Sequence, residues 1–340
     1  MPTRDGRIDG GINRDWGIDR DWGIDRGKGN VKASVIVPTR GGAERLPALL
    51  SSLAAQTHTE WEAIVVIDGD IDRSAKVVAE YAHLPVRSIV FPENRGRVAA
   101  LNAGLADADG DVLLRVDDDF ELSPGHLAAH LAQHEKGEHG VIGLPRNIAQ
   151  PTRYMRVYGV EADERGRREA YAIEASERWR LWGGNVSVTR ATYERVGGYD
   201  PRYRGYGWED VDYGYRVHLA GVPIVLARDA EVRHHVASVT TPIRVRRAFD
   251  SGAARRTFDS IHGAGVSGPP YPVASSTWNR MVIGVSKRLS RGRADRLARC
   301  VEGGIVLLPR SVARRAIGLC VEAAGVAGYR VGRDATGADS

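Results

Sequence analysis

Short apolar runs rich in valine and isoleucine alternate with helical segments through the first half of the chain. The run Ala33–Pro38 precedes a segment, Glu44–Ala55, in which leucines recur at helical spacing. The next run, Trp61–Asp68, again leads into a helical segment, Asp72–Ala82. Strands are expected again at 87–91, 111–116 and 140–144, with helices at 97–106 and 124–134. This alternation predicts βαβ units, and therefore an α/β fold with a mainly parallel sheet flanked by helices.

The second half of the chain shows the same kinds of element less regularly. Residues 150–180 are charged and have no clear period, so we expect irregular structure there. Beyond Thr241 we expect Arg-rich helices, interrupted at 263–272 by Gly and Pro. Between these regions, strands are expected at 185–188, 222–227 and 230–234, and helices after Thr189 and at 211–220.

The first thirty residues differ in composition from the rest. The hexamer Asp-Trp-Gly-Ile-Asp-Arg occurs at 15–20 and again at 21–26, in a segment rich in Gly, Asp and Arg. Two copies are too few for a solenoid, and so polar a segment buries too little apolar surface to offset its ordering entropy. We expect residues 1–30 to be a disordered tail; the alternative is a Trp-bearing interaction peptide.

The charge of the chain is unevenly distributed. The formal net charge is +5, but residues 241–340 carry 17 Lys and Arg against 7 Asp and Glu, so the first 240 residues are acidic overall. Because most of the chain is acidic, we expect no nucleic-acid partner. The basic region 241–340 is expected to pack on the rest of the chain as a helical subdomain. The alternatives are an acceptor-binding lid and a peripheral contact with an anionic membrane.

The composition also limits the cellular compartment in which the protein is expected. Only two cysteines are present, Cys300 and Cys320, which excludes a disulfide framework and a cysteine-based metal site. The N-terminus has no apolar signal core, and the longest uncharged stretch contains Gly, Pro and Ser. We expect a cytoplasmic protein, with the inner face of the membrane as the alternative location.

Three consecutive carboxylates, Asp117, Asp118 and Asp119, directly follow one of the expected strands. Adjacent carboxylates repel one another, but they are tolerated at the carboxyl end of a parallel strand, where α/β sheets bind ligands. Two carboxylates in an Asp-x-Asp arrangement can hold a hard divalent cation that keeps open positions for phosphate oxygens. The triplet is therefore a candidate metal and phosphate site; the alternative is a solvated turn.

Two further polar loops are expected at the same edge of the sheet. Asp68 ends the strand that begins at Trp61, and the loop 94–97 (Asn-Arg-Gly-Arg) opens a helix. Arginine beside a helix N-terminus is a favourable site for a diphosphate. Each loop alone is also explained as a capped turn, but three such loops at one edge of a sheet favour a ligand site.

Residues 33–235 contain a set of short motifs in a fixed order. The motifs are Ser34-Val-Ile-Val-Pro-Thr-Arg40, Gln56-Thr57, Ile64-Val-Val-Ile-Asp68, Asn94-x-Gly96-x-x-Ala-Ala-x-Asn102-x-Gly104, Val116-Asp-Asp-Asp119, Trp182-Gly-Gly-Asn185, Gly197-Gly198 and Gly207-Trp-Glu-Asp210. Together they resemble the inverting glycosyltransferases of family 2, which have the GT-A fold. The part from Leu181 to Ala220 is especially similar to the galactosyltransferase-type C-terminal half of this fold. The resemblance implies a GT-A catalytic domain over residues 31–240, preceded by the tail and followed by the helical region.

The resemblance also implies roles for individual residues. Asp119 would bind Mn²⁺ or Mg²⁺ directly, together with Asp117. Arg97 would lie near the diphosphate and Asp68 near the nucleotide base. The donor would be a sugar linked to UDP, GDP or dTDP. The residues expected to bind it are Pro38, Thr39, Arg40, Asp68, Asn94, Arg97, Asp117 and Asp118.

An acidic pair, Glu209-Asp210, is the expected catalytic centre. It matches the family's pair that supplies the catalytic base, and we choose Asp210 because a helix N-terminus favours an ionised carboxylate. As general base it would take the proton of the acceptor hydroxyl, while a metal ion and Arg97 neutralise the leaving diphosphate. The alternative is that both residues are ordinary helix-terminal acids. The residues expected to frame the donor sugar and the acceptor are Trp182, Gly183, Gly184, Asn185 and Trp208.

Histidines fall at two places where they could bind a metal. The resemblance implies that His234 is a further candidate metal ligand. The alternative is that it is an ordinary histidine at the end of a strand. Because a strand alternates its faces, only one of His234 and His235 should face the site. His126, His130 and His134 share one helix face, which we expect to be solvated rather than metal-bound.

These features predict a metal-dependent inverting glycosyltransferase of the hexosyltransferase class. It would move a single sugar to a hydroxyl of a glycan, a lipid-linked acceptor or a small molecule. A sugar-phosphate nucleotidyltransferase is the competing enzymatic hypothesis, but no lysine follows Gly41-Gly42 until Lys76. The non-enzymatic hypotheses are a nucleotide-sugar-binding pseudoenzyme and an Arg-rich nucleic-acid binder. A polymerising synthase is not expected.

Overall fold

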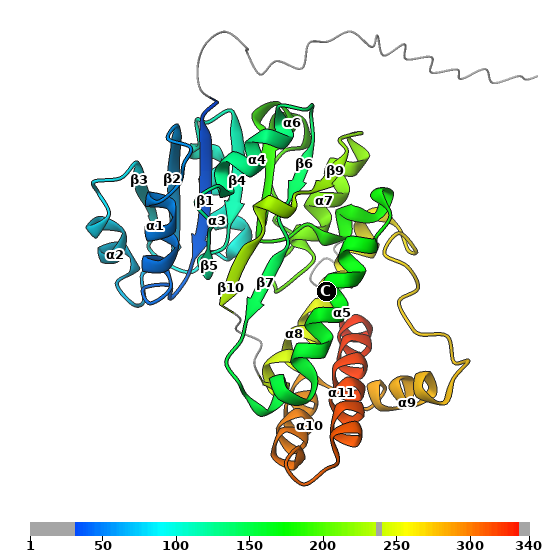
Figure 1. Ribbon diagram of the computed structural model, residues 1–340. Helices are drawn as coiled ribbons and strands as arrows, with labels where there is room; N and C mark the ends of the chain where they lie inside the picture. Colours follow the sequence, from blue (N-terminus) through cyan, green and yellow to red (C-terminus); the bar gives the residue numbers. More distant parts are fainter. Residues whose placement is uncertain (1–30, 236–239, 333–340) are drawn as a thin grey trace, which may run out of the picture.

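The computed structural model describes residues 31–235 and 240–332, which are built around a seven-stranded sheet (Figure 1). The strand order is β3-β2-β1-β4-β8-β6-β9. Strands β1 to β4 are parallel to one another, whereas β8 runs antiparallel to its neighbours β4 and β6. The expected α/β fold with a mainly parallel sheet is therefore confirmed. The strands are β1 Ala33–Thr39, β2 Trp61–Asp68, β3 Val86–Phe91, β4 Val112–Val116, β6 Gly140–Ile142, β8 Asn185–Thr189 and β9 Ile224–Leu226.

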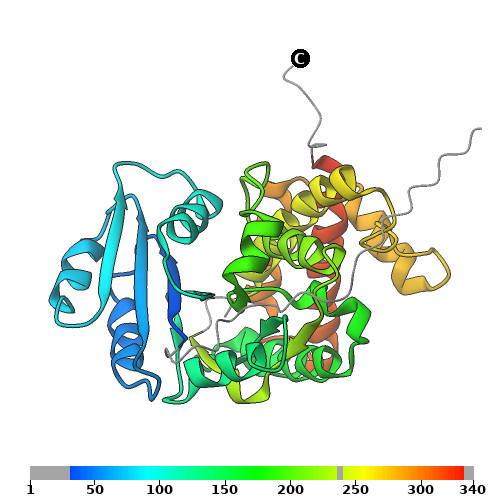
Figure 2. The same ribbon diagram turned by 90° about the horizontal axis from the view of Figure 1, so that it is seen from above.

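Helices cover both faces of the sheet because its central strands are apolar on both faces (Figure 2). Along β1, Val35 packs in one core cluster with the leucines of α1, and Ile36 packs in another with α3. A Cβ at Gly104 would lie 2.6 Å from Ile36 Cγ2, so glycine lets α3 lie directly on β1. The helices of this region are α1 Leu46–Ala54, α2 Ser74–Glu80, α3 Arg97–Asp107, α4 His126–His134, α6 Arg190–Val196 and α7 Glu209–Leu219.

A second, three-stranded sheet follows the acidic triplet. It has the order β5-β10-β7. Its strands are β5 Phe120–Glu121, β7 Pro145–Ile148 and β10 Val232–His235. Strand β10 runs antiparallel to β5 and parallel to β7. This small sheet brings the residues just after the triplet next to the strand that carries His234.

The segment 150–180 is more regular than its sequence indicated. It forms a π-helical turn, Met155–Gly159, the helix α5, Val160–Ala172, and a 3₁₀ helix, Ala175–Leu181. The expectation of irregular structure was wrong because α5 has no buried residue, so its sequence lacks the apolar stripe that marks a packed helix. The other expected helices and strands are present, with ends shifted by a few residues.

Four helices form the C-terminal part of the described chain (Figure 1). Helices α8 and α11 pack closely because glycines face the neighbouring backbone: a Cβ at Gly328 would lie 1.9 Å from the carbonyl oxygen of Phe249. The expectation of Arg-rich helices interrupted between 263 and 272 is confirmed. The helices are α8 Thr241–His262, α9 Thr277–Ser286, α10 Arg291–Gly304 and α11 Arg310–Val331.

The aliphatic side chains of this region are only partly buried. Ile305 and Ile317 are buried, whereas Leu308 and Val312 are exposed to 39% and 47%. Within residues 31–235 and 240–332, no helix is long and apolar enough to cross a membrane. The N-terminal hexamer repeat and the expected tail lie outside the described residues.

Candidate active site

The loops that follow β1, β2 and β4 leave the sheet at one edge, because these strands are parallel. Thr39, Asp68 and Asp117 stand at or just beyond the three strand ends. Helix α3, which follows the parallel strand β3, begins at Arg97 on the same edge. The expectation that several polar loops share one edge of the sheet is therefore confirmed.

Asp68 holds the loop that leads into α3. Its Oδ1 accepts the backbone N–H of Arg95 at 2.5 Å, and its Oδ2 accepts that of Gly96 at 2.9 Å. Asn94 Oδ1 accepts the Gly96 N–H as well, at 3.1 Å. Gly96 has a φ of +90°, which glycine adopts without strain. Both oxygens of Asp68 are thus engaged within the protein, and its contact with a nucleotide base stays a prediction.

Asp118 is held inside the protein by Arg45 and Thr39. Arg45 donates to both carboxylate oxygens, from Nε at 3.1 Å and from Nη2 at 2.8 Å, and the Thr39 hydroxyl also donates to Oδ2. Asp118 is 8% exposed, and burial raises its pKa against the opposing effect of Arg45. Of the other donor residues expected on this loop, Pro38 is buried in β1 and Arg40 is exposed. Asp118 therefore ties the end of β1 to the acidic triplet.

Asp119 and His234 face each other beside the small sheet. Asp119 Oδ2 lies 3.2 Å from His234 Nε2, and each side chain is about one-fifth exposed. His234 Nδ1 lies 2.7 Å from Asn147 Oδ1, and since an amide oxygen only accepts, Nδ1 carries a proton. Nε2 then either carries a second proton or directs a lone pair toward Asp119. His235 points instead toward Glu121, at 3.2 Å.

The Asp119–His234 pair has the donor types of a divalent-cation site. A histidine whose other ring nitrogen is hydrogen-bonded is the usual arrangement at metal sites, and Asn147 is itself held by Asp163. A carboxylate and an imidazole supply two ligands and leave positions for diphosphate oxygens. In the part of the chain that the structure describes, no group of three or more His, Cys, Asp or Glu could hold a metal ion.

A buried arginine, Arg115, pairs with the carboxylates of Asp117 and Asp210. It lies in β4, is 3% exposed, and donates from Nε to Asp117 at 3.0 Å and from Nη1 to Asp210. Burial acts to raise the pKa of Asp117, but the charges of Arg115 and Arg97 outweigh it, so the pKa is lowered. Asp117 is thus paired with an internal cation, and Asp119 is the member of the triplet that faces His234.

Glu209 and Asp210 open α7 side by side in different surroundings. Glu209 is 2% exposed, its Oε2 has no hydrogen-bond partner among the described residues, and Arg97 Nη1 lies 3.7 Å from its Oε1. Burial and the neighbouring Asp210 raise the pKa of Glu209 to about 7. The Asp210 side chain is 17% exposed and pairs with Arg115; burial raises its pKa above the usual value. Asp210 is therefore the member of the pair that a substrate can reach.

The raised pKa of Glu209 makes stability depend on pH. The folded protein holds this proton more tightly than the unfolded chain, so stability falls as the pH rises from 4.5 to about 7. Glu209→Gln cannot ionise. We therefore expect it to exceed the wild type in stability by about 1–3 kcal/mol near pH 8, and to match it near pH 4. Denaturant unfolding of both proteins across this range measures the difference, and a difference that stays constant with pH would contradict the burial of an ionisable Glu209.

The backbone just before the acidic pair is strained. Trp208 has a φ of +67°, which is rare for a bulky residue, and Gly207 before it has a φ of +93°. The indole N–H of Trp208 donates to Ser251 Oγ at 3.1 Å, and its ring centroid lies 5.1 Å from that of Phe258 on α8. Trp208 also lines a cavity of about 510 Å³ between α8, α11 and the segment 269–272. Helix α8 thus stabilises the conformation that presents the acidic pair.

The Trp-Gly-Gly-Asn segment supports the site mainly from within the core. Trp182 is 4% exposed and stacks on Tyr213, with ring centroids 5.8 Å apart. Asn185 is 3% exposed, and its amide donates to two backbone oxygens. A Cβ at Gly184 would lie 2.4 Å from Asp117 Oδ2, so a larger residue here would displace this carboxylate. The two glycines are partly exposed, and contact of this segment with a sugar stays a prediction.

The three histidines of α4 are buried rather than solvated. His126 and His130 are 0% exposed and His134 is 3% exposed. Ser187 Oγ on β8 lies 2.8 Å from His130 Nδ1 and 2.8 Å from His134 Nε2. Burial lowers the pKa of His130 to about 4 and that of His134 to about 3. The expectation of a solvated face was wrong because α4 packs this face against β8, where the histidines are neutral core residues.

Three residues of the site were not expected from the sequence: Arg45, Arg115 and Asn147. The signal for Arg115 was a single charge in an otherwise apolar strand, because a buried arginine needs carboxylate partners. Arg45 and Asn147 carried no such signal. Their partners, Asp118 and His234, lie 73 and 87 residues away in the sequence.

The mixed sheet with its polar carboxyl edge defines a GT-A glycosyltransferase fold. A mannosyltransferase from Pyrobaculum calidifontis, solved in complex with GDP-Man and Mn²⁺, superposes with a TM-score of 0.60 at 18% identity over 89% of each chain. S. aureus TarS in complex with UDP superposes with a TM-score of 0.50 at 16% identity, covering 88% of this chain and 89% of that chain. The expected GT-A fold is therefore confirmed.

Comparison of the sequence assigns the family. The profile of glycosyl transferase family 2 matches residues 34–195, and that of the N-terminal domain of galactosyltransferase matches residues 158–237. The chain belongs to glycosyltransferase family 2, with a galactosyltransferase-like segment at the C-terminal end of the matched region. The predicted family is thus confirmed.

Two curated relatives illustrate the breadth of the family. The chain is 30% identical over 227 residues to validoxylamine A glucosyltransferase of Streptomyces hygroscopicus subsp. jinggangensis, a match that covers 58% of this chain and 54% of the relative. It is 28% identical over 193 residues to undecaprenyl-phosphate 4-deoxy-4-formamido-L-arabinose transferase of Proteus mirabilis, covering 55% of this chain and 52% of the relative. The chain thus spans about half the length of the curated relatives that it matches.

Proposed function

We propose that the chain is a metal-dependent inverting glycosyltransferase that moves a single hexose from a nucleotide-diphosphate sugar to an acceptor hydroxyl. One observation carries the proposal: Asp117 and Asp210 share the buried Arg115, which brings the acidic pair of α7 next to the triplet that contains Asp119. A candidate base and a candidate cation site therefore lie at the same edge of the sheet, as transfer from a diphosphate requires.

The donor would be held by its diphosphate. Asp119 and His234 would hold Mn²⁺ or Mg²⁺, which supplies positive charge to the leaving diphosphate. The Arg97 side chain, at the start of α3, is 45% exposed, so it can donate to a phosphate oxygen. The backbone N–H groups at the same helix start favour an anion there. In this proposal the nucleotide lies along the loops after β1 and β2.

Asp210 would act as the general base. Its ion pair with Arg115 holds the carboxylate at the edge of the site. The raised pKa makes Asp210 a stronger proton acceptor than an ordinary aspartate. The acceptor oxygen loses its proton to Asp210 and forms a bond to the anomeric carbon. The bond from that carbon to the diphosphate oxygen breaks on the opposite side, which inverts the anomeric configuration.

In this proposal the acceptor is a small molecule or a lipid-linked compound. The names of the two relatives include validoxylamine A and undecaprenyl phosphate. Part of such an acceptor would fit in the cavity of about 510 Å³ that Trp208 lines.

A thermal-shift panel of UDP-, GDP- and dTDP-linked sugars with Mn²⁺ tests the proposal. A ligand that binds only the folded state stabilises it by about 2.7 kcal/mol at a hundredfold excess over Kd, which raises the Tm by several degrees. We expect one donor to do so with Mn²⁺ and not after removal of the metal with EDTA. Stabilisation by a nucleoside triphosphate and a sugar phosphate, with release of pyrophosphate, would point instead to nucleotidyl transfer.

A further inference from the structure

The turn between α10 and α11 lies at the end of the molecule remote from the sheet (Figure 1). A group of aliphatic side chains is exposed there. Val306 is 60% exposed, Leu307 is 87% exposed, and Leu308 and Val312 are exposed to 39% and 47%. Every residue from 306 to 312 is exposed. A single apolar residue on a surface is ordinary, but four exposed ones within residues 306–312 indicate a surface that something covers.

Arginines surround this turn. The segment 291–315 contains seven arginines and two acidic residues. Arg310, Arg314 and Arg315 are exposed in the first turns of α11; Arg310 lies between Leu308 and Val312, and the other two lie immediately beyond Val312. Glu161 pairs with Arg310 and Arg314, whereas Arg315 forms no ion pair with a described residue. The surface around the turn is therefore apolar at its tip and positively charged at its base.

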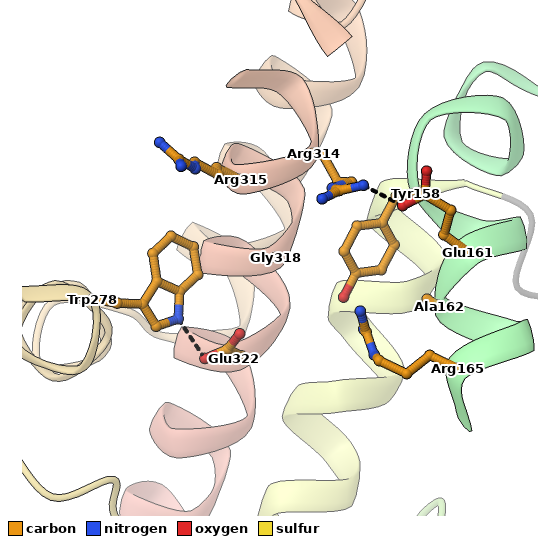
Figure 3. A pocket seen from close by; sticks show the side chains of 9 residues that line it. All are labelled: Tyr158, Glu161, Ala162, Arg165, Trp278, Arg314, Arg315, Gly318 and Glu322. Atoms are coloured by element: carbon orange, nitrogen blue, oxygen red, sulfur yellow. Dashed lines mark hydrogen bonds and ion pairs between the residues drawn. The ribbon is translucent and has the colours of Figure 1, made fainter. Parts of the chain in front are cut away.

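A cavity of about 290 Å³ opens along α11 next to the same arginines (Figure 3). Arg314 and Arg315 line it together with Arg165 from α5 and the rings of Tyr158 and Trp278. Figure 3 shows Arg314 reaching across to Glu161, and the indole of Trp278 donating to Glu322. Arginine is a strong donor to phosphate, and Trp and Tyr are typical of the layer between water and lipid.

We propose that the turn 305–312 and the first turns of α11 dock on the surface of an anionic lipid bilayer. The four aliphatic side chains enter the interfacial layer, and the arginines at the base of the turn contact lipid phosphates. A bilayer offers an apolar layer and a negatively charged surface at adjoining depths, in the same order as the tip and the base of the turn. A second copy of this chain would instead place arginine against arginine.

Vesicle sedimentation of the full chain tests this inference. We expect binding to vesicles of phosphatidylcholine with phosphatidylglycerol, and little binding to phosphatidylcholine alone. The double variant Val306→Ser/Leu307→Ser should weaken partitioning at least about tenfold, because two inserted aliphatic side chains are lost. Arg314→Gln/Arg315→Gln should weaken it as well and reduce its dependence on salt. Leu219→Ser, at a residue that is 62% exposed on α7, is the matched control and should bind as the wild type does.

All of these positions are exposed, so we expect the variants to melt at the wild-type temperature. A wild-type protein that binds neither kind of vesicle would overturn the inference. Unchanged sedimentation of Val306→Ser/Leu307→Ser would do the same. A dimer that forms without lipid and is lost in this variant would assign the turn to a second copy of the chain. None of these readouts depends on sugar transfer, so the inference stands or falls separately from the proposed function.

Discussion

Asp210→Asn is expected to lower the rate of sugar transfer by about 10²–10⁴-fold, the usual contribution of a general base, while donor binding stays within a few-fold of the wild type. Asparagine has the shape of aspartate and still offers Oδ1 to Arg115, but it cannot take a proton from the acceptor. Asp210→Ala should abolish transfer too, but it removes a partner of a buried arginine and is expected to be less stable by about 3–5 kcal/mol. The asparagine variant is therefore the cleaner measurement.

The assay pairs transfer rates with donor binding by calorimetry, using the donor that the thermal-shift panel selects. Glu209→Gln is the matched control, since it neutralises the neighbouring carboxylate on the same helix turn. Full transfer activity in Asp210→Asn would contradict the assignment of the base. Loss of transfer in Glu209→Gln alone would move that role to Glu209, whose pKa near 7 also suits a base.

Asp119→Ala should abolish transfer and, unlike the Asp210 variants, should also remove the metal-dependent part of donor binding. Asp119 is the carboxylate of the triplet that faces His234, whereas Asp117 and Asp118 are paired with Arg115 and Arg45. Loss of the metal-binding carboxylate is expected to weaken Mn²⁺-dependent donor binding by more than about 10–100-fold. A loss of about 10–100-fold is typical when the residue removed only hydrogen-bonds to a metal-binding side chain.

Asn147→Ala is the variant with which Asp119→Ala is compared. It removes the hydrogen bond that orients His234, together with the one from Asn147 to Asp163, but it leaves the expected metal ligands in place. We therefore expect a loss of about 10–100-fold in metal affinity with the same dependence on Mn²⁺. Isothermal titration with the donor, in Mn²⁺ and in EDTA, measures donor affinity for the wild type, Asp119→Ala and Asn147→Ala. The cation site would have to be placed elsewhere if Asp119→Ala bound the donor with Mn²⁺ as tightly as the wild type.

Local patterns predicted the elements of the sheet well, because each depends on a short stretch of residues. The runs that became β1 and β2 are apolar throughout, as strands buried on both faces must be. The parallel order then follows from the helices between them, and it brings the loop after Asp68 and the loop that begins at Asp117 to one edge. The helix α5 escaped prediction because it buries no side chain and so leaves no apolar period.

The charge pairs of the site could not be predicted from local sequence patterns. In the acidic triplet, one carboxylate pairs with Arg45, one with Arg115 and one faces His234, although the three are adjacent in sequence. Each partner comes from a different element, and nothing local distinguishes the three positions. The histidines of α4 show the converse: an identical spacing is compatible with a solvated face and with a buried one, and only the packing of α4 against β8 separates the two.

The α/β class, the family, and the set of acidic and basic residues from which a site could be built were predictable from the amino-acid sequence. Those properties depend on periodicity and on motifs a few residues long. Three other properties emerged from the packing of the folded chain: which carboxylate each arginine neutralises, that α8 holds the strained Trp208 through Ser251, and that the turn after α10 leaves its aliphatic side chains exposed. These outcomes depend on contacts between residues far apart in the chain, where burial and charge, rather than local propensity, set the free energy.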